Sequence, residues 1–426
     1  MGDVSPAQIH IDDYASPWLP WAIRALNAVG EPAVRRLVRL DEDDLLAAAR
    51  KRTGLDDFGD PSFLEPFRLL LDALEREAHL SAFGRISTRQ LLLQLLSSRL
   101  LIEERIKRHP EILEEKIERP IIIAGPPRTG TTHLFNLIAQ DSDLRTLPYW
   151  ESLEPLLPEK EQPAPGQPDP RIARAEKSIA FLDWMMPHFR AMHEFTADGP
   201  HEEIQLLAIH FSTQLFEASY DIPSYAEWYR TSDQTPAYQY LKRVLQVLQW
   251  IRRGTRWVLK TPQHLENLKA LTVTFPDARF IQTHRDPVPI TASLVTMIAY
   301  GRRMQTRAAA LDPIAIGHHW AKRLEDSLRS SVEHRHLLPP SQVFDVPFRE
   351  FMQDSVGMVE RVFAFAEQQP SPHTAAAIRT AAQRSPRGKH GTIVYRLEDF
   401  GLDAKERRRA LRFYQERFNV PSEGDE

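Results

Sequence analysis

The sequence predicts an α/β protein: a three-layer domain around a central parallel β-sheet, with a helical subdomain at the N-terminus. From residue 119 onward, short runs of β-branched and aromatic residues alternate with longer segments whose apolar residues recur at helical spacing. This alternation is typical of βαβ units, whose right-handed crossovers make successive strands parallel. Before residue 119 the chain is instead rich in helical patterns alone.

The helical region is expected to span residues 1–118 as an N-terminal subdomain or cap. Within it, residues 41–54 (DEDDLLAAARKRTG) begin with acidic residues and end with basic residues and a glycine. That order of charges suits a helix dipole and its C-terminal cap. Residues 119–426 are expected to form the α/β domain, with an insertion of loops and helices at about 145–250 that borders the site.

One amphipathic segment of the N-terminal region, residues 15–37, carries two tryptophans and several arginines. We expect its aromatic side chains to pack into a core, as aromatic stripes on helices usually do. Peripheral contact with a membrane surface is the alternative, because basic amphipathic helices also bind there.

Composition narrows the functional classes. The 426-residue chain has a net charge of -4, so bulk charge does not indicate nucleic acid as a partner. It has no cysteine, which excludes disulfides, thiol catalysis and cysteine-based metal sites. With no basic-apolar leader and no apolar run of about 20 residues, we expect a cytoplasmic protein. The sequence does not indicate an oligomeric state.

Four segments are predicted as strands, at residues 121–123, 257–259, 279–283 and 343–346. The first leads through Gly125 into a polar turn and then a helix. A turn of this kind directs backbone N–H groups at one point, where the helix dipole favours an anion. The spacing of Gly125 and Gly130 matches that of a nucleoside-triphosphatase P-loop, but Thr131 stands where the P-loop lysine should be. The sequence therefore predicts a P-loop-like phosphate cradle without triphosphate chemistry.

The turns that follow three of these strands carry cationic residues: Arg128, Lys260 and Arg285. Ligands of parallel α/β sheets bind beyond the carboxyl ends of the strands. We therefore expect the three cations to converge on one anionic ligand with phosphates at two separate places.

The combination resembles the PAPS-dependent sulfotransferases, in which PAPS is 3′-phosphoadenosine 5′-phosphosulfate. Arg285 with Ser293 eight residues later is similar to their 3′-phosphate signature, and residues 387–391 resemble a basic glycine loop that closes over the same cofactor. The resemblance covers about residues 119–400. It implies that the 5′-phosphosulfate is held by Pro127, Arg128, Thr129, Gly130, Thr131 and Thr132, and the rest of PAPS by Arg285, Ser293, Arg387, Gly388 and Lys389.

The resemblance also implies catalytic roles. Arg128 and Lys260 would neutralise charge in the transition state, since Lys260 stands where tyrosylprotein and related sulfotransferases carry a lysine. Glu151 resembles the glutamate that tyrosylprotein and some bacterial sulfotransferases use as general base, and we favour it. His264 is a second candidate, and His201, Glu202 or Glu203 a third. No metal is expected.

The expected acceptor is the hydroxyl of a small hydrophobic molecule or lipid, because the segments after Trp150, at 184–195 and at 225–240 are rich in aromatic residues. Two other functional classes remain open: a nucleotide-dependent kinase, and a non-catalytic helical scaffold that keeps a degenerate nucleotide fold. Binding of ATP with magnesium, or absence of sulfate transfer, would distinguish them.

Overall fold

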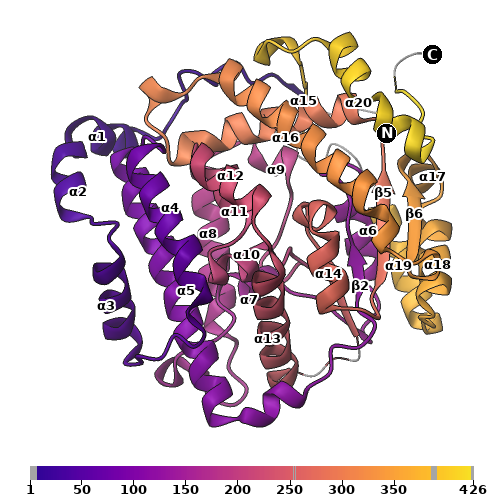
Figure 1. The fold of residues 1–426 in the computed structure, drawn as a ribbon, viewed down its shortest axis with the longest axis horizontal. Helices are drawn as coiled ribbons and strands as arrows, with labels where there is room; N and C mark the ends of the chain where they lie inside the picture. The colour runs from indigo at the N-terminus through magenta and orange to yellow at the C-terminus, as the bar shows by residue number, and fades with distance from the viewer. Residues whose placement is uncertain (1–6, 253, 255, 385–390, 424–426) are drawn as a thin grey trace.

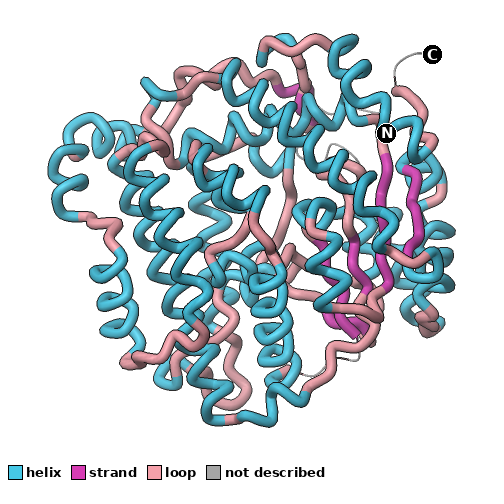
Figure 2. The backbone as a smooth tube through the Cα atoms, in the orientation of Figure 1, coloured by secondary structure: helices cyan, strands magenta, loops and turns pink. Residues whose placement is uncertain are grey.

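A five-stranded parallel sheet lies at one side of a largely helical molecule (Figure 1, Figure 2). The computed structural model describes residues 7–252, 254, 256–384 and 391–423. The strand order is β3-β4-β2-β5-β6, with β2 at Ile121–Ile123, β3 at Leu144–Arg145, β4 at Arg256–Lys260, β5 at Arg279–His284 and β6 at Val343–Pro347. The four predicted strands are confirmed. The two-residue β3 was missed, since so short a segment carries no periodic signal.

Alternating side chains of the sheet pack on two helical layers. Ile121 and Ile123 join a cluster with residues of α6 (Thr131–Ile138), α18 (Ser355–Ala366) and α19 (Pro372–Arg384). Ile122 points to the opposite face and joins residues of α13 (Thr235–Ile251) and α14 (Leu268–Thr274). Successive residues of a strand face opposite sides, so an all-apolar strand requires cover on both. The predicted three-layer α/β arrangement is confirmed.

The N-terminal region is helical, with α1 at Trp21–Val29, α2 at Glu31–Leu37, α3 at Glu42–Thr53, α4 at Leu64–Arg76 and α5 at Ala82–Arg108 (Figure 1). The capping of α3 follows the predicted pattern: the Asp41 carboxylate accepts from the Asp44 backbone N–H at 3.1 Å, and Gly54 ends the helix with φ 74°. Leucines of α4 and α5 share one hydrophobic cluster with α13, α14 and β2. The division at residue 118 therefore stays a prediction about domain organisation.

Between β3 and β4 the chain forms the insertion. Its helices are α7 at Tyr149–Leu153, α8 at Pro170–Met185, α9 at Phe189–Met192, α10 at Ile204–Leu207, α11 at Gln214–Ser219, α12 at Pro223–Thr231 and α13. The helices after β5 are α15 at Pro287–Gly301, α16 at Pro313–His334, α17 at Phe348–Gln353, α18, α19 and α20 at Ala404–Phe418. Near the ends of the chain, β1 (Gln8–Ile9) pairs in parallel with β7 (Thr392–Ile393). Among the described residues, no helix is long and apolar enough to cross a membrane.

Candidate functional site

The loop between β2 and α6 forms a cradle of backbone groups. Gly130 precedes α6 with φ 82°, and no side chain caps the helix, so its first-turn N–H groups are available to an anion. Gly125 lies against β5, where a Cβ atom would stand 2.0 Å from the Thr283 hydroxyl oxygen. Thr129 is buried beneath the loop, and its hydroxyl donates to the Pro126 carbonyl at 2.7 Å. Close packing of the loop on the sheet thus fixes its backbone conformation.

Arg128 has a left-handed backbone, with φ 68°. This conformation costs a non-glycine residue about 1–2 kcal/mol and is commonest where function requires it. Arg285 helps to hold it, because its Nη1 donates to the Arg128 carbonyl at 2.9 Å. The Arg128 guanidinium donates to the Met192 carbonyl and, at 3.3 Å, to the Tyr395 hydroxyl.

Arg285 presents its guanidinium fork to a carboxylate. Its Nε and Nη2 donate to the two oxygens of Glu423 at 2.7 and 2.8 Å, and the guanidinium lies 4.2 Å from the centroid of the Phe348 ring. A fork that holds two carboxylate oxygens has the geometry to hold two phosphate oxygens. Ser293, its predicted partner, is buried on α15.

Lys260 is buried at the carboxyl end of β4. Its Nζ donates to Glu202 Oε1 at 2.5 Å and approaches the Thr132 hydroxyl at 3.4 Å. Its ammonium group therefore lies beside the first turn of α6. The structure brings Arg128, Lys260 and Arg285 to the same edge of the sheet, as the strand ends predicted.

Glu202 carries a charge in this setting. Burial opposes ionisation, but the attraction of Lys260 outweighs it and lowers the pKa of Glu202 below its ordinary 4.5. Burial also lowers the pKa of the neighbouring imidazoles, that of His201 to about 3 and that of His193 to about 4, which favours their neutral form. Both histidines are therefore neutral at pH 7, and the carboxylate is the charged group that faces Lys260.

The adjacent Glu203 and the candidate base His264 form a buried structural pair. Glu203 accepts from the Lys260 backbone N–H at 2.9 Å and bonds to His264 Nε2, while His264 Nδ1 lies 2.9 Å from the Tyr238 hydroxyl. His264 is fully buried and both of its ring nitrogens have partners. These contacts hold the end of β4 in place.

Glu151, the base favoured from the sequence, is also enclosed by partners. Its Oε2 accepts from Arg145 at 2.5 Å and from Arg252 at 3.1 Å, and the residue is buried. The site adjoins a large cavity. Neither Glu151 nor His264 lines this cavity, whereas His201 and Glu202 do.

A cavity of about 1000 Å³ joins the cradle to an apolar chamber. Of the residues predicted to bind the donor, those that line the cavity are Pro127, Arg128, Gly130, Thr131, Thr132 and Arg285. Thr129 and Ser293 are buried behind the wall, and Lys260 reaches it through Thr132 and Glu202. Arg387, Gly388 and Lys389 lie outside the described residues.

Apolar residues of the insertion and of two later helices form the other end of the cavity. The lining includes Leu182, Met186, Phe189, Leu294, Met297, Ile298, Trp320 and Leu324. The segment at 184–195 thus contributes, as expected. The stretch at 225–240 does not: Tyr225, Tyr229 and Tyr238 are buried in the core, because their helices pack against α4 and α14.

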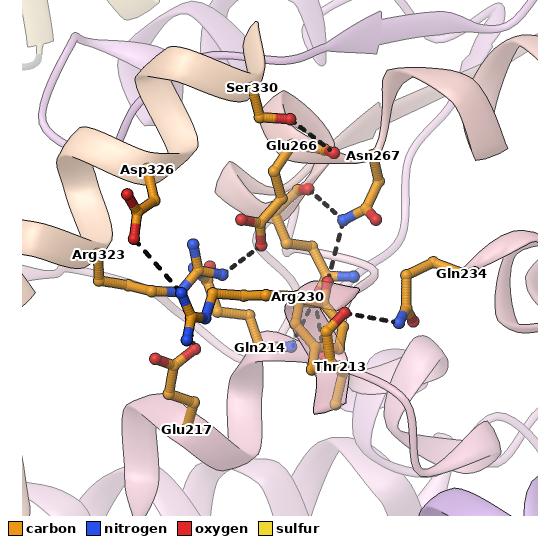
Figure 3. A network of polar contacts seen from close by, with 12 residues as sticks. Thr213, Gln214, Glu217, Arg230, Gln234, Glu266, Asn267, Arg323, Asp326 and Ser330 are labelled. Atoms are coloured by element: carbon orange, nitrogen blue, oxygen red, sulfur yellow. Dashed lines mark hydrogen bonds and ion pairs between the residues drawn. The ribbon is translucent and has the colours of Figure 1, made fainter. Parts of the chain in front are cut away.

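A buried ion-pair network braces this apolar end (Figure 3). Arg323 of α16 donates to Glu217 at 2.9 Å and to Glu266 at 2.5 Å, linking three segments that surround the chamber. Burial opposes the charge of Arg323, but the two carboxylates outweigh it and raise the pKa of the guanidinium. The chamber therefore has a rigid wall.

Three polar contacts of the site were not foreseen: Glu423 on Arg285, and Tyr395 and the Met192 carbonyl on Arg128. No local pattern marks these residues, because each meets its partner only through the tertiary fold. Among the described residues, no group of three His, Asp or Glu side chains is placed to hold a metal ion.

Comparison with known proteins gives consistent results. Residues 120–371 match the model of the Sulfotransferase family. The structure is similar to that of sulfotransferase STF9 from Mycobacterium avium, with TM-score 0.80, 28% identity, and coverage of 91% of this chain and 98% of the other. It also resembles STF1 from Mycobacterium tuberculosis H37Rv, with TM-score 0.71, 29% identity, and coverage of 87% and 98%.

Among curated proteins, the chain is similar to the omega-hydroxy-beta-dihydromenaquinone-9 sulfotransferase Stf3 of Mycobacterium bovis and of Mycobacterium tuberculosis. Each is 26% identical over 261 residues, or 57% of this chain. The aligned region spans 61% of the length of each relative.

Proposed function

Because the chain belongs to the sulfotransferase family, we propose that it transfers a sulfuryl group from PAPS to a hydroxyl of a lipid-like acceptor. The products are adenosine 3′,5′-bisphosphate (PAP) and a sulfate ester. One observation carries the proposal: a single cavity has an anion-binding cradle with converging cations at one end and an apolar chamber at the other. The first suits the donor and the second the acceptor.

The donor residues fit two separate anionic groups. The uncapped start of α6 and the side chain of Arg128 suit the 5′-phosphosulfate. The fork of Arg285, with Ser293 on the following helix, suits the 3′-phosphate, as its bidentate contact with Glu423 supports. The assignment of Arg387, Gly388 and Lys389 to the donor rests on resemblance alone.

In the proposed reaction, the acceptor oxygen forms a bond to sulfur while the bond between sulfur and the 5′-phosphate oxygen breaks. Negative charge then grows on the leaving phosphate. We assign its neutralisation to Arg128 and Lys260, supported by the contact of Lys260 with Thr132 and by the uncapped N–H groups of α6. The acceptor proton passes to a base.

We assign the base to Glu202 in place of Glu151 and His264. Glu202 is ionised, lines the cavity and lies 2.5 Å from the ammonium group of Lys260. Glu151 is held by two arginines away from the cavity, and His264 is enclosed in the core. A base must reach the proton that it removes, so geometry decides before basicity does.

A lipid-like acceptor agrees with the apolar lining, since the hydroxyl groups of a polar acceptor such as a polysaccharide would find few hydrogen-bond partners there. The name of the Stf3 relatives, which specifies an omega-hydroxylated menaquinone derivative, points to the same chemical class. The match covers only part of those relatives, so the individual acceptor is left open.

The test is transfer of labelled sulfate from PAPS to a panel of long-chain and short-chain alcohols. The wild type should label long-chain alcohols, and Arg128→Ala should lose activity while keeping its melting temperature. Binding of ATP with magnesium in place of PAP would support the kinase alternative. PAP binding without any sulfate transfer across the panel would support the scaffold alternative.

A further inference from the structure

A set of large apolar side chains is exposed on α1, α2, α8 and the segment before α1. We call it the aromatic surface and define it as Trp18, Trp21, Val29, Leu37, Phe181 and Trp184. Val29 is 82% exposed, Leu37 78% and Trp21 75%, the highest values among large apolar residues in the described part of the chain. Exposed apolar groups gathered in this way mark interaction sites.

This exposure corrects an expectation from the sequence. The tryptophans of residues 15–37 were expected to pack in a core, but within α1 only Ile23 is buried and α2 buries no residue. Both helices are short and lie at the periphery of the molecule (Figure 1). A short peripheral helix has one face in contact with the protein, so its remaining apolar residues face outward.

Phe83 at the start of α5 joins the parts of the aromatic surface. Its backbone N–H donates to the Asn27 side chain of α1 at 2.9 Å. Its ring lies 5.8 Å from that of Phe181, which in turn lies 5.7 Å from the ring of Trp184. The exposed residues of α1 and α8 therefore belong to neighbouring elements.

Positive charge accompanies the aromatic surface. Between residues 18 and 39 there are four arginines and one acidic residue, Glu31, in a chain whose net charge is -4. All four arginines are exposed; Arg39 lies 3.8 Å from Asp41, so Arg24, Arg35 and Arg36 supply the positive charge of this region. Aromatic and basic side chains together match the interfacial region of a bilayer that contains anionic lipids.

One of these segments, α8, also contributes to the wall of the cavity. Leu182 and Met186 line it from the end of α8, beside the exposed Phe181 and Trp184. The Trp18 carbonyl accepts from Arg303 at 3.4 Å, and the adjacent Met304 lines the cavity. Exposed Phe181 and cavity-lining Leu182 are consecutive residues of α8, so this part of the aromatic surface adjoins the apolar chamber.

We propose that the aromatic surface binds the interfacial region of an anionic bilayer and so places the apolar chamber next to membrane-held acceptors. The docking step is independent of the chemistry at the donor end. The use of docking to collect acceptors rests on the proposed function.

The first test uses the full chain and extruded vesicles that contain about 30 mol% phosphatidylglycerol in phosphatidylcholine, with binding measured by co-sedimentation. Trp21→Ser with Val29→Ser should lower the partition coefficient at least tenfold, because two apolar side chains leave the interface. The matched control is Ile251→Ser with Val273→Ser, which removes two exposed apolar residues elsewhere and should bind like wild type. Equal binding by the two double variants would overturn the proposal, as would a wild type that stays in solution.

The second test concerns charge. Arg35→Glu with Arg36→Glu should weaken binding to the anionic vesicles roughly tenfold or more, and added salt should weaken wild-type binding. Arg379→Glu with Arg409→Glu reverses two exposed arginines elsewhere and should have little effect. If the two pairs behave alike, the charge of residues 18–39 has no specific role and that part of the proposal is wrong.

Two further measurements separate the possible failures. Calorimetry with PAP should give the same affinity for every surface variant as for the wild type. If the wild type does not bind PAP at all, the donor assignment is refuted, while the membrane docking proposal is unaffected. Sedimentation velocity without vesicles tests the other occupant of the surface. If the wild type forms a dimer that Trp21→Ser abolishes, the aromatic surface binds a second copy of the chain and not a membrane, and the proposal is overturned.

Discussion

The two ends of the cavity are built in different ways. At the donor end, the cations stand at or shortly after the carboxyl ends of three strands. Hydrogen bonds restrain the guanidiniums of Arg128 and Arg285 and the ammonium of Lys260. At the acceptor end, apolar side chains come from α8 and from the consecutive helices α15 and α16, which follow α8 only after the rest of the insertion and two strands. The donor end is organised to recognise charge at set positions, and the acceptor end selects by shape and apolar area.

Glu202 lies where the two ends meet, and its removal should have the largest effect. Glu202→Gln should lower kcat about 100-fold or more, because the base is removed, while PAP affinity stays near wild type, because Arg128 and Arg285 are unchanged. Since the pKa of Glu202 is below 4.5, the base stays ionised as pH falls, and kcat/KM should decline only below about that pH. Labelled-sulfate kinetics against pH measure both.

Glu151→Gln is the matched control. It should lower the melting temperature, because Arg145 would lose its buried partner, and should leave kcat within a few-fold of wild type. A strong loss of kcat in Glu151→Gln beside normal turnover in Glu202→Gln would reverse our assignment of the base.

Arg285→Ala tests the donor end alone. It should weaken PAP binding roughly 50-fold or more by calorimetry, because two charge-assisted hydrogen bonds to a phosphate are lost. Arg361→Ala removes an exposed, ion-paired arginine on α18 and should bind PAP normally. PAP affinity that is unchanged in Arg285→Ala would contradict the placement of the 3′-phosphate.

Ala218→Leu tests the acceptor end alone, since Ala218 lines the chamber. The added carbons should raise KM for long-chain alcohols about tenfold by overfilling the wall, without changing PAP affinity or KM for short-chain alcohols. Ala376→Leu on the exposed face of α19 is the control. A parallel rise in KM for alcohols of every length would show that the chamber does not measure chain length.

The smallest expected effect concerns Glu423, which pairs with Arg285 when no PAPS or PAP is bound. A phosphate at Arg285 must displace this carboxylate, so Glu423→Gln should tighten PAP binding. Both side chains are partly exposed, with relative exposures of 23% and 41%, so the gain should be at most about fivefold. Calorimetry at low and moderate salt measures it, and weaker PAP binding in the variant would show that Glu423 supports the site.

Much of the donor end could be predicted because its signals are local. A buried strand, a glycine turn and a helix start occupy consecutive residues. Lys260 ends one strand, Arg285 directly follows another, and Arg128 lies in the turn after a third. Parallel strands bring such positions to one edge whatever the rest of the chain does. The acceptor end has no local signal, and the aromatic stretch at 225–240 illustrates this: its tyrosines became core.

By itself, the sequence determined the α/β class, four strands and the positions of the cations, because hydrophobic period and turn residues act over a few neighbours. The tertiary structure decided which of several glutamates faces the cavity. Glu151, Glu202 and Glu203 are the same residue type, and their partners differ only because folding brought Arg252, Lys260 and His264 to them. It also decided that Trp21 faces outward, since burial depends on what packs against a helix and not on the helix alone.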